Sequence, residues 1–160
     1  MRKAQAITDK AFSEVITRIK PGMSELELQA ELIYCLYKNG GTGLAFSPIV
    51  VSGPNTSLPH GVAGERIIRE GDFVTMDFGA SYKGYCSDMT RTVSLGKVSD
   101  EQMKVYETVR TAQKAAIDYL TGGGLSLNRG GRDYLSAKLG RPVRVKAADK
   151  NNAGTKSKQM

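Results

Sequence analysis

The stretch EGDFVTMDFGASYKGYCSDMTRTVSLGKVSDEQ, residues 70–102, decides the fold of this 160-residue chain. Its segments 72–80 and 85–95 are rich in Phe, Val, Thr and Tyr, which favour β-strands. The residues SYKG at 81–84, between these segments, are typical of a turn. The stretch therefore predicts an antiparallel β-hairpin.

Two aspartates in this hairpin are candidates for a metal site. A turn centred between Tyr82 and Lys83 gives facing residues a constant number sum of 165, so Asp77 and Asp88 would lie directly opposite each other. Their Cβ atoms would then be ~5 Å apart, and two apposed carboxylates need a shared proton or a cation. Carboxylate oxygens suit divalent metals. The alternative is that both aspartates face solvent, and a turn shifted by one residue would unpair them.

Two helical patterns precede the hairpin. Apolar residues at three- and four-residue spacing predict an amphipathic helix over 1–20. Ser24, with Glu27 three residues later, forms a capping box, so a second helix is expected to start there and to end before Gly40-Gly41.

One further strand and one further helix complete the pattern. FSPIVVS at 46–52 predicts a strand. Ser99 and Gln102 form another capping box, which predicts a third helix ending near Leu120. Helices and an antiparallel hairpin together indicate an α+β fold.

The composition is ordinary for a globular protein, with 40% hydrophobic and 24% charged residues. Apolar runs are short, so no membrane association is expected, and the N-terminus has no apolar segment typical of a secretory signal. Cys35 and Cys86 form no CxxC motif. These features predict a reduced, cytoplasmic protein.

The positive charge is confined to the end of the chain. Residues 1–120 hold 14 Lys and Arg against 14 Asp and Glu, whereas residues 121–160 hold 9 against 2, so the whole net charge of +7 lies there. This division predicts a structured domain over 1–120 and a basic tail over 121–160, with one short helix near 131–140 and disorder after it. The tail has a single aromatic residue, Tyr134, so a solvated tail is expected rather than nucleic-acid binding.

Two single residues have open alternatives. His60, in TSLPHG, is the only histidine, and it is either a surface residue or a hydrogen-bond donor to a substrate. Cys86 is expected to be a core cysteine, with a ligand role for a softer metal as the alternative.

The segments GPNTSLPHG at 53–61 and residues 70–102 resemble the pita-bread metallopeptidases, and within that family the Xaa-Pro dipeptidases and Xaa-Pro aminopeptidases. The resemblance implies half of a pita-bread fold, a curved antiparallel sheet with helices on one face. It implies that Asp77 and Asp88 are the first two metal ligands, with Asp88 bridging two divalent ions (Mn, Co or Zn). It further implies that His60 is the catalytic-site histidine that binds substrate, a peptide with proline at the second position.

The chain departs from the family pattern after the hairpin. The family requires one more histidine ligand and two glutamate ligands, yet no histidine follows His60 and no glutamate follows Glu107. At most one weakly bound ion and no catalysis are therefore expected, as in a truncated, fused or frame-shifted product. Half of the fold would leave apolar surface exposed, which predicts self-association. The alternatives are a non-enzymatic binding protein on a half-domain, and specificity like that of methionine aminopeptidases.

Overall fold

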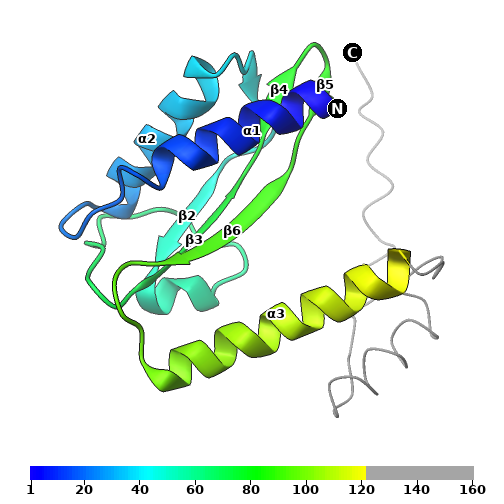
Figure 1. The fold of residues 1–160 in the computed structure, drawn as a ribbon. Helices are drawn as coiled ribbons and strands as arrows, with labels where there is room; N and C mark the ends of the chain where they lie inside the picture. Colours follow the sequence, from blue (N-terminus) through cyan, green and yellow to red (C-terminus); the bar gives the residue numbers. More distant parts are fainter. Residues whose placement is uncertain (122–160) are drawn as a thin grey trace, which may run out of the picture. The chain divides into compact units, whose positions relative to one another are not determined.

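The structure, a computed structural model, describes residues 1–121. The chain divides into two compact units, Met1–Asp100 and Glu101–Met160, and both β-sheets belong to the first. The elements, most of which are labelled in Figure 1, confirm the α+β class. They are α1 (Arg2–Val15), α2 (Glu25–Lys38), β1 (Gly43–Leu44), β2 (Ile49–Ser52), the 3-10 helix η1 (Gly53–Ser57), β3 (Phe73–Phe78), β4 (Ala80–Tyr82), β5 (Tyr85–Cys86), β6 (Met89–Ser94) and α3 (Asp100–Thr121).

The second helix, α2, begins where its capping box predicts. The Glu27 N–H donates to the Ser24 hydroxyl at 3.1 Å, and the Ser24 N–H donates to the Glu27 carboxylate at 2.7 Å. These bonds satisfy backbone groups that the first turn leaves without helical partners. The helix ends at Lys38, and Gly40 beyond it has a φ of +98°, which glycine adopts readily.

The first helix, α1, is shorter than the predicted range of 1–20, because it ends at Val15. The N–H and the hydroxyl of Thr17 both donate to the Glu14 carbonyl, at 3.2 and 2.7 Å, and this tight turn stops the helix. Ile19 still packs against the core although it lies beyond the helix. The apolar pattern therefore continues past the last helical residue.

The predicted hairpin supplies strands to two antiparallel sheets, with orders β2-β3-β6 and β1-β4-β5. At its tip, Lys83 and Gly84 have φ angles of +49° and +79°, as a two-residue type I′ turn requires. The turn is therefore centred one residue later than predicted. Facing residues, such as Phe73 and Ser94, have numbers that sum to 167 rather than 165.

The two hairpin strands come into close contact at Gly79 and Ser87, between the two sheets. A Cβ on Gly79 would lie 1.9 Å from the Ser87 carbonyl oxygen, so the position requires glycine. The Ser87 hydroxyl accepts from the Ala80 N–H at 2.9 Å, and the Ser87 N–H donates to the Ala80 carbonyl at 2.9 Å. The same hydroxyl is hydrogen-bonded to Thr8, so the Gly79–Ser87 contact is fixed to α1.

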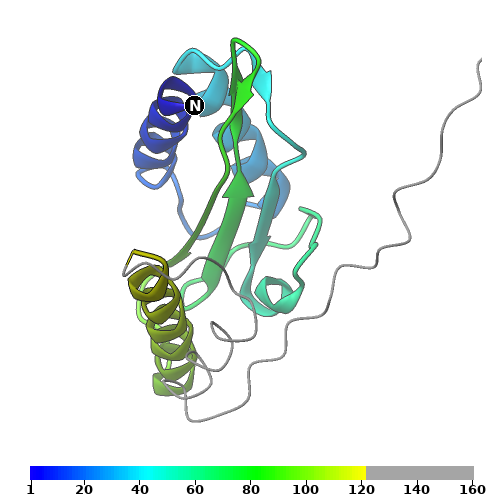
Figure 2. The same cartoon turned by 90° about the vertical axis from the view of Figure 1, so that its right-hand side faces the viewer.

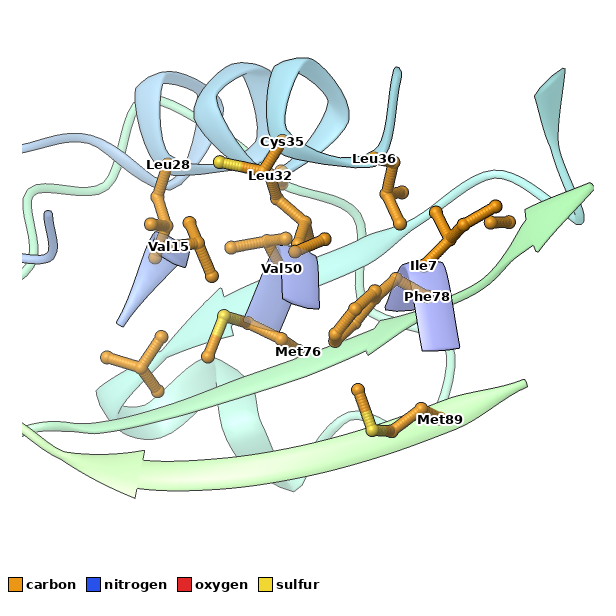
Figure 3. Packing of buried hydrophobic residues seen from close by; sticks show 14 of the residues in the cluster. Ile7, Val15, Leu28, Leu32, Cys35, Leu36, Val50, Met76, Phe78 and Met89 are labelled. Atoms are coloured by element: carbon orange, nitrogen blue, oxygen red, sulfur yellow. The ribbon is translucent and has the colours of Figure 1, made fainter. Parts of the chain in front are cut away.

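The hydrophobic core lies between one face of the sheets and the helices α1 and α2. Successive strand residues point to opposite faces. Val74, Met76 and Phe78 are buried, whereas Thr75 and Asp77 between them are partly exposed. Figure 2 shows α1 and η1 on opposite sides of the strands. Figure 3 shows the inward side chains of β3 among residues from both helices, β2 and β6: Ile7, Val15, Leu28, Leu32, Leu36, Val50 and Met89.

The third helix, α3, spans Asp100–Thr121 and confirms the helix predicted after Ser99. Of the helices in residues 1–121, none is both long and apolar enough to cross a membrane. The helix predicted near 131–140, and the disorder predicted after it, lie outside the described residues.

Replacement of Gly79 tests the Gly79–Ser87 contact. We expect Gly79→Ala to lower the free energy of unfolding by about 3 kcal/mol, the upper end for overpacking, because the methyl group would overlap the Ser87 carbonyl. Gly43→Ala is the matched control, since the nearest atom to its Cβ is 3.8 Å away on Ser81. Urea unfolding followed by circular dichroism measures both variants. Equal midpoints for the two would contradict the steric argument.

Candidate functional site

The two predicted metal-ligand aspartates do not face each other directly. Asp77 pairs with Thr90 of β6, whereas Asp88 lies one residue before that strand. The predicted Asp77–Asp88 pairing is wrong, because the type I′ turn is centred one residue later, which moves the partner of Asp77 by two residues, from Asp88 to Thr90.

Both aspartates nevertheless lie on the same face of the hairpin. Ser87 and Met89 are buried, whereas Asp88 and Thr90 are exposed. Because strand side chains alternate, Asp88 points to the same side as Thr90, which faces Asp77 across the strands. This side, the outer face of the hairpin, is the one opposite α1 and α2.

Threonine hydroxyls order the outer face around Asp77. The Thr90 hydroxyl donates to Oδ1 of Asp77 at 2.9 Å. Two residues further along each strand, on the same face, the hydroxyls of Thr75 and Thr92 are hydrogen-bonded at 3.0 Å. Thr90 therefore fixes the orientation of the Asp77 carboxylate. The sequence prediction missed this role, because a number sum of 165 would pair Thr90 with Thr75 instead of Asp77.

His60 is exposed, on the loop that follows η1. The adjacent residue, Gly61, packs so closely on β2 that a Cβ would lie 2.7 Å from Cγ1 of Val51. Val51 pairs with Thr75, so its side chain shares the outer face with Asp77. The structure therefore brings the loop of His60 to the same face as both aspartates.

Glu25, at the start of α2, holds this loop, and the sequence prediction missed it. Its side chain is fully buried. The carboxylate accepts from the Ser52 N–H at 2.7 Å, the Asn55 side chain at 3.1 Å and the Gly64 N–H at 3.2 Å. A signal exists in the sequence, because Glu25 lies three residues before Leu28 on the buried face of the helix.

An ion pair extends this hydrogen-bonded network. Both terminal nitrogens of Arg66 donate to Asp72, at 2.7 and 3.1 Å, and one of them also donates to the Ser52 hydroxyl. Burial by itself raises the pKa of Asp72. The hydrogen bonds from Arg66 and from the Arg69 N–H outweigh burial, so the pKa lies below its ordinary value of 3.8.

The donor set on the outer face does not fit a complete dinuclear metal centre. Across residues 1–121, no group of three or more His, Cys, Asp or Glu side chains could together hold an ion. Asp77 and Asp88 supply oxygen ligands of the type that hard divalent ions prefer. Two carboxylates amount to a partial site.

Cys86 does not lie in the core, so that prediction is wrong. The cysteine is exposed, in the short strand β5, where it pairs with Ser81. The reason is its position in a two-residue strand beside the turn, where both residues are exposed. Cys35, in contrast, is fully buried on the inner face of α2.

Comparison with known proteins assigns this architecture to a family. Residues 1–139, most of the chain, match metallopeptidase family M24. The chain therefore belongs to this family of metallopeptidases. The matched region includes the hairpin, the loop of His60 and all of α3.

The relatives include an uncharacterized peptidase and two solved structures named for the Xaa-Pro bond. The uncharacterized peptidase YqhT of Bacillus subtilis is 42% identical over 140 residues, which cover 86% of this chain and 40% of YqhT. The solved Xaa-Pro dipeptidase from Bacillus anthracis matches with a TM-score of 0.72 and 42% identity, over 84% of this chain and 39% of that one. The X-Pro aminopeptidase from Thermotoga maritima matches with a TM-score of 0.69 and 44% identity, over 71% and 32%. The predicted partial pita-bread fold is confirmed, and the chain spans 40% or less of the length of these relatives.

Acid titration tests the ion pair at Asp72. Because the pKa of this carboxyl is lowered on folding, its stabilising effect is present above its unfolded pKa and is lost as the pH falls through the folded value. We expect Asp72→Asn to lower the free energy of unfolding by about 1–3 kcal/mol near neutral pH. The difference in the free energy of unfolding between Asp72→Asn and the wild type should become smaller below about pH 4.

The matched control for this titration is Asp9→Asn, at an exposed position on α1. Urea unfolding between about pH 3 and pH 7 compares the three proteins. A gap between Asp72→Asn and the wild type that stays constant over this range would contradict the assignment.

Proposed function

We propose that this chain contains part of the active site of a metal-dependent peptidase that acts on Xaa-Pro bonds. In this proposal Asp77 and Asp88 hold metal and His60 contacts the peptide. The main support is the placement of both carboxylates on the outer face, beside the loop of the only histidine. The similarity to an Xaa-Pro dipeptidase and an X-Pro aminopeptidase supports the substrate class.

Each of these residues has a defined part in the proposal. The Thr90 hydroxyl, bonded to Oδ1 of Asp77, orients that carboxylate. Asp88, exposed on the same face, offers a second pair of oxygens. His60 is exposed, and an imidazole N–H can donate a hydrogen bond to a peptide carbonyl in either protonation state. A bound metal would supply a Lewis acid that polarises the peptide carbonyl toward hydrolysis.

We further propose that the 160-residue chain does not hydrolyse peptides by itself. No histidine follows His60 and no glutamate follows Glu107, so the chain lacks the three further ligands that the family resemblance implies. A general base for proton transfer is missing for the same reason. In this proposal the reaction class is inferred from the family, and Asp77 and Asp88 are the two metal ligands that this chain contributes.

A peptidase assay and a metal titration test these proposals together. The purified 160-residue chain is incubated with Ala-Pro and either Mn²⁺ or Co²⁺, and we expect proline release no faster than with the metal alone. Isothermal titration with Mn²⁺ should give at most one weakly bound ion per chain, and Asp77→Ala or Asp88→Ala should abolish that binding.

The control for the metal titration is Asp9→Ala, which removes an exposed carboxylate from α1 and should leave Mn²⁺ binding unchanged. Turnover that Asp77→Ala abolishes would contradict the proposed inactivity. Mn²⁺ binding that survives both site substitutions would contradict the proposed ligands.

We also propose that the chain self-associates. The sheet order leaves β2 and β6 as edge strands, and such edges can pair with another chain. On and beside the loop of His60, Leu58 and Val62 are also exposed, at 54% and 84%, and exposed apolar surface favours association. Sedimentation velocity should show a coefficient that rises with protein concentration. A single monomeric species at every concentration would contradict this proposal.

A further inference from the structure

We propose that Glu25 is a positioning residue for His60, because its buried carboxylate holds both ends of the loop on which the histidine lies. This inference rests on the proposed contact between His60 and the peptide. It adds Glu25, a buried residue of α2 that is not on the outer face, to the residues that determine how a substrate is bound.

The first end of the loop is held by one carboxylate oxygen. Oε1 of Glu25 accepts from the Ser52 N–H at 2.7 Å and from the Ser52 hydroxyl at 2.8 Å. It also accepts from the Asn55 side chain at 3.1 Å. These bonds fix η1 at the point where the chain leaves β2.

The second end of the loop is held by the other oxygen and by the start of α2. Oε2 of Glu25 accepts from the Gly64 N–H at 3.2 Å. The backbone N–H of Glu25 donates to the Arg66 carbonyl at 3.0 Å, and that of Leu26 donates to the Gly64 carbonyl at 3.2 Å. N–H groups of the first turn of α2, which have no partner within the helix, thus donate to carbonyls of the residues that follow the loop.

A carboxylate is the appropriate group at this position. Each group that is hydrogen-bonded to the Glu25 side chain is a donor, and a carboxylate can accept all of these bonds. Hydrogen bonds to a charged acceptor are also stronger than those to a neutral one. The positive end of the helix dipole and the nearby Arg66 offset the buried negative charge. A glutamine would turn its amide N–H₂ toward some of these donors and leave them unsatisfied.

The segment between the two ends depends on them for its position. Leu58, Pro59 and His60 are all exposed, and Gly61 packs against Val51. Exposed residues gain little from burial, so loosening of the ends should be transmitted to the imidazole. Glu25 therefore acts on a substrate through His60 rather than by contact.

NMR of His60 tests this inference directly, since the chain has no other histidine and its imidazole signals are unambiguous. In metal-free buffer, we expect Glu25→Gln to shift and broaden these signals while the methyl signals of the core remain dispersed. Titration with Ala-Pro should shift the wild-type imidazole signals, and Glu25→Gln should weaken that binding about tenfold, the ratio expected for one lost hydrogen bond.

Glu27→Ala is the matched control. It removes another glutamate from the first turn of α2, but Glu27 is exposed and bonds only within the capping box that Ser24 forms. The control should leave the His60 signals unchanged. If Glu25→Gln does not fold, Asn55→Ala, which removes one bond at the edge of the same network, replaces it.

Three outcomes are decisive. Unchanged His60 signals in a folded Glu25→Gln overturn the positioning role, as do equal changes in Glu27→Ala. Altered His60 signals in Glu25→Gln, with no response of the wild type to Ala-Pro, support the positioning role and contradict the proposed peptide contact of His60.

Discussion

The close approach of Gly79 to Ser87 is the constraint on which the rest of this structure depends. Without a Cβ at residue 79, the two backbones can pass so closely that the Ser87 hydroxyl becomes the acceptor for the Ala80 N–H. That hydroxyl also reaches Thr8, so Ser87 has to point toward α1. Strand alternation then turns the next residue, Asp88, to the outer face. One glycine thus connects helix packing to the direction of a candidate metal ligand.

Much of the fold could be predicted because it depends on neighbours in sequence. The capping box of Ser24 and Glu27 and the β-rich segments of the hairpin are local signals, and both are confirmed. The predicted turn centre was wrong by one residue, and the strand partners therefore by two, because SYKG allows more than one turn centre. Only the positive φ angles of Lys83 and Gly84 select the type I′ turn.

The residues of the candidate site could be predicted less completely from the sequence alone. Asp77, Asp88 and His60 were found through hairpin spacing and family resemblance, and their roles remain proposals. Glu25 was missed because its partners lie 27 to 39 residues away, and a first-turn glutamate ordinarily signals a helix start. Only tertiary contacts distinguish a glutamate that caps a helix from one that fixes a distant loop.

The division of β3 into two faces has a consequence for how such proteins evolve. The side chains that pack against α1 and α2, Met76 and Phe78 among them, lie on the opposite face from Asp77. Most of the free energy of folding comes from that buried face, and substitutions at exposed positions change stability little. The aspartates can therefore be replaced over many generations while the architecture persists. Descent from a peptidase and retention of its chemistry are separable properties of this fold.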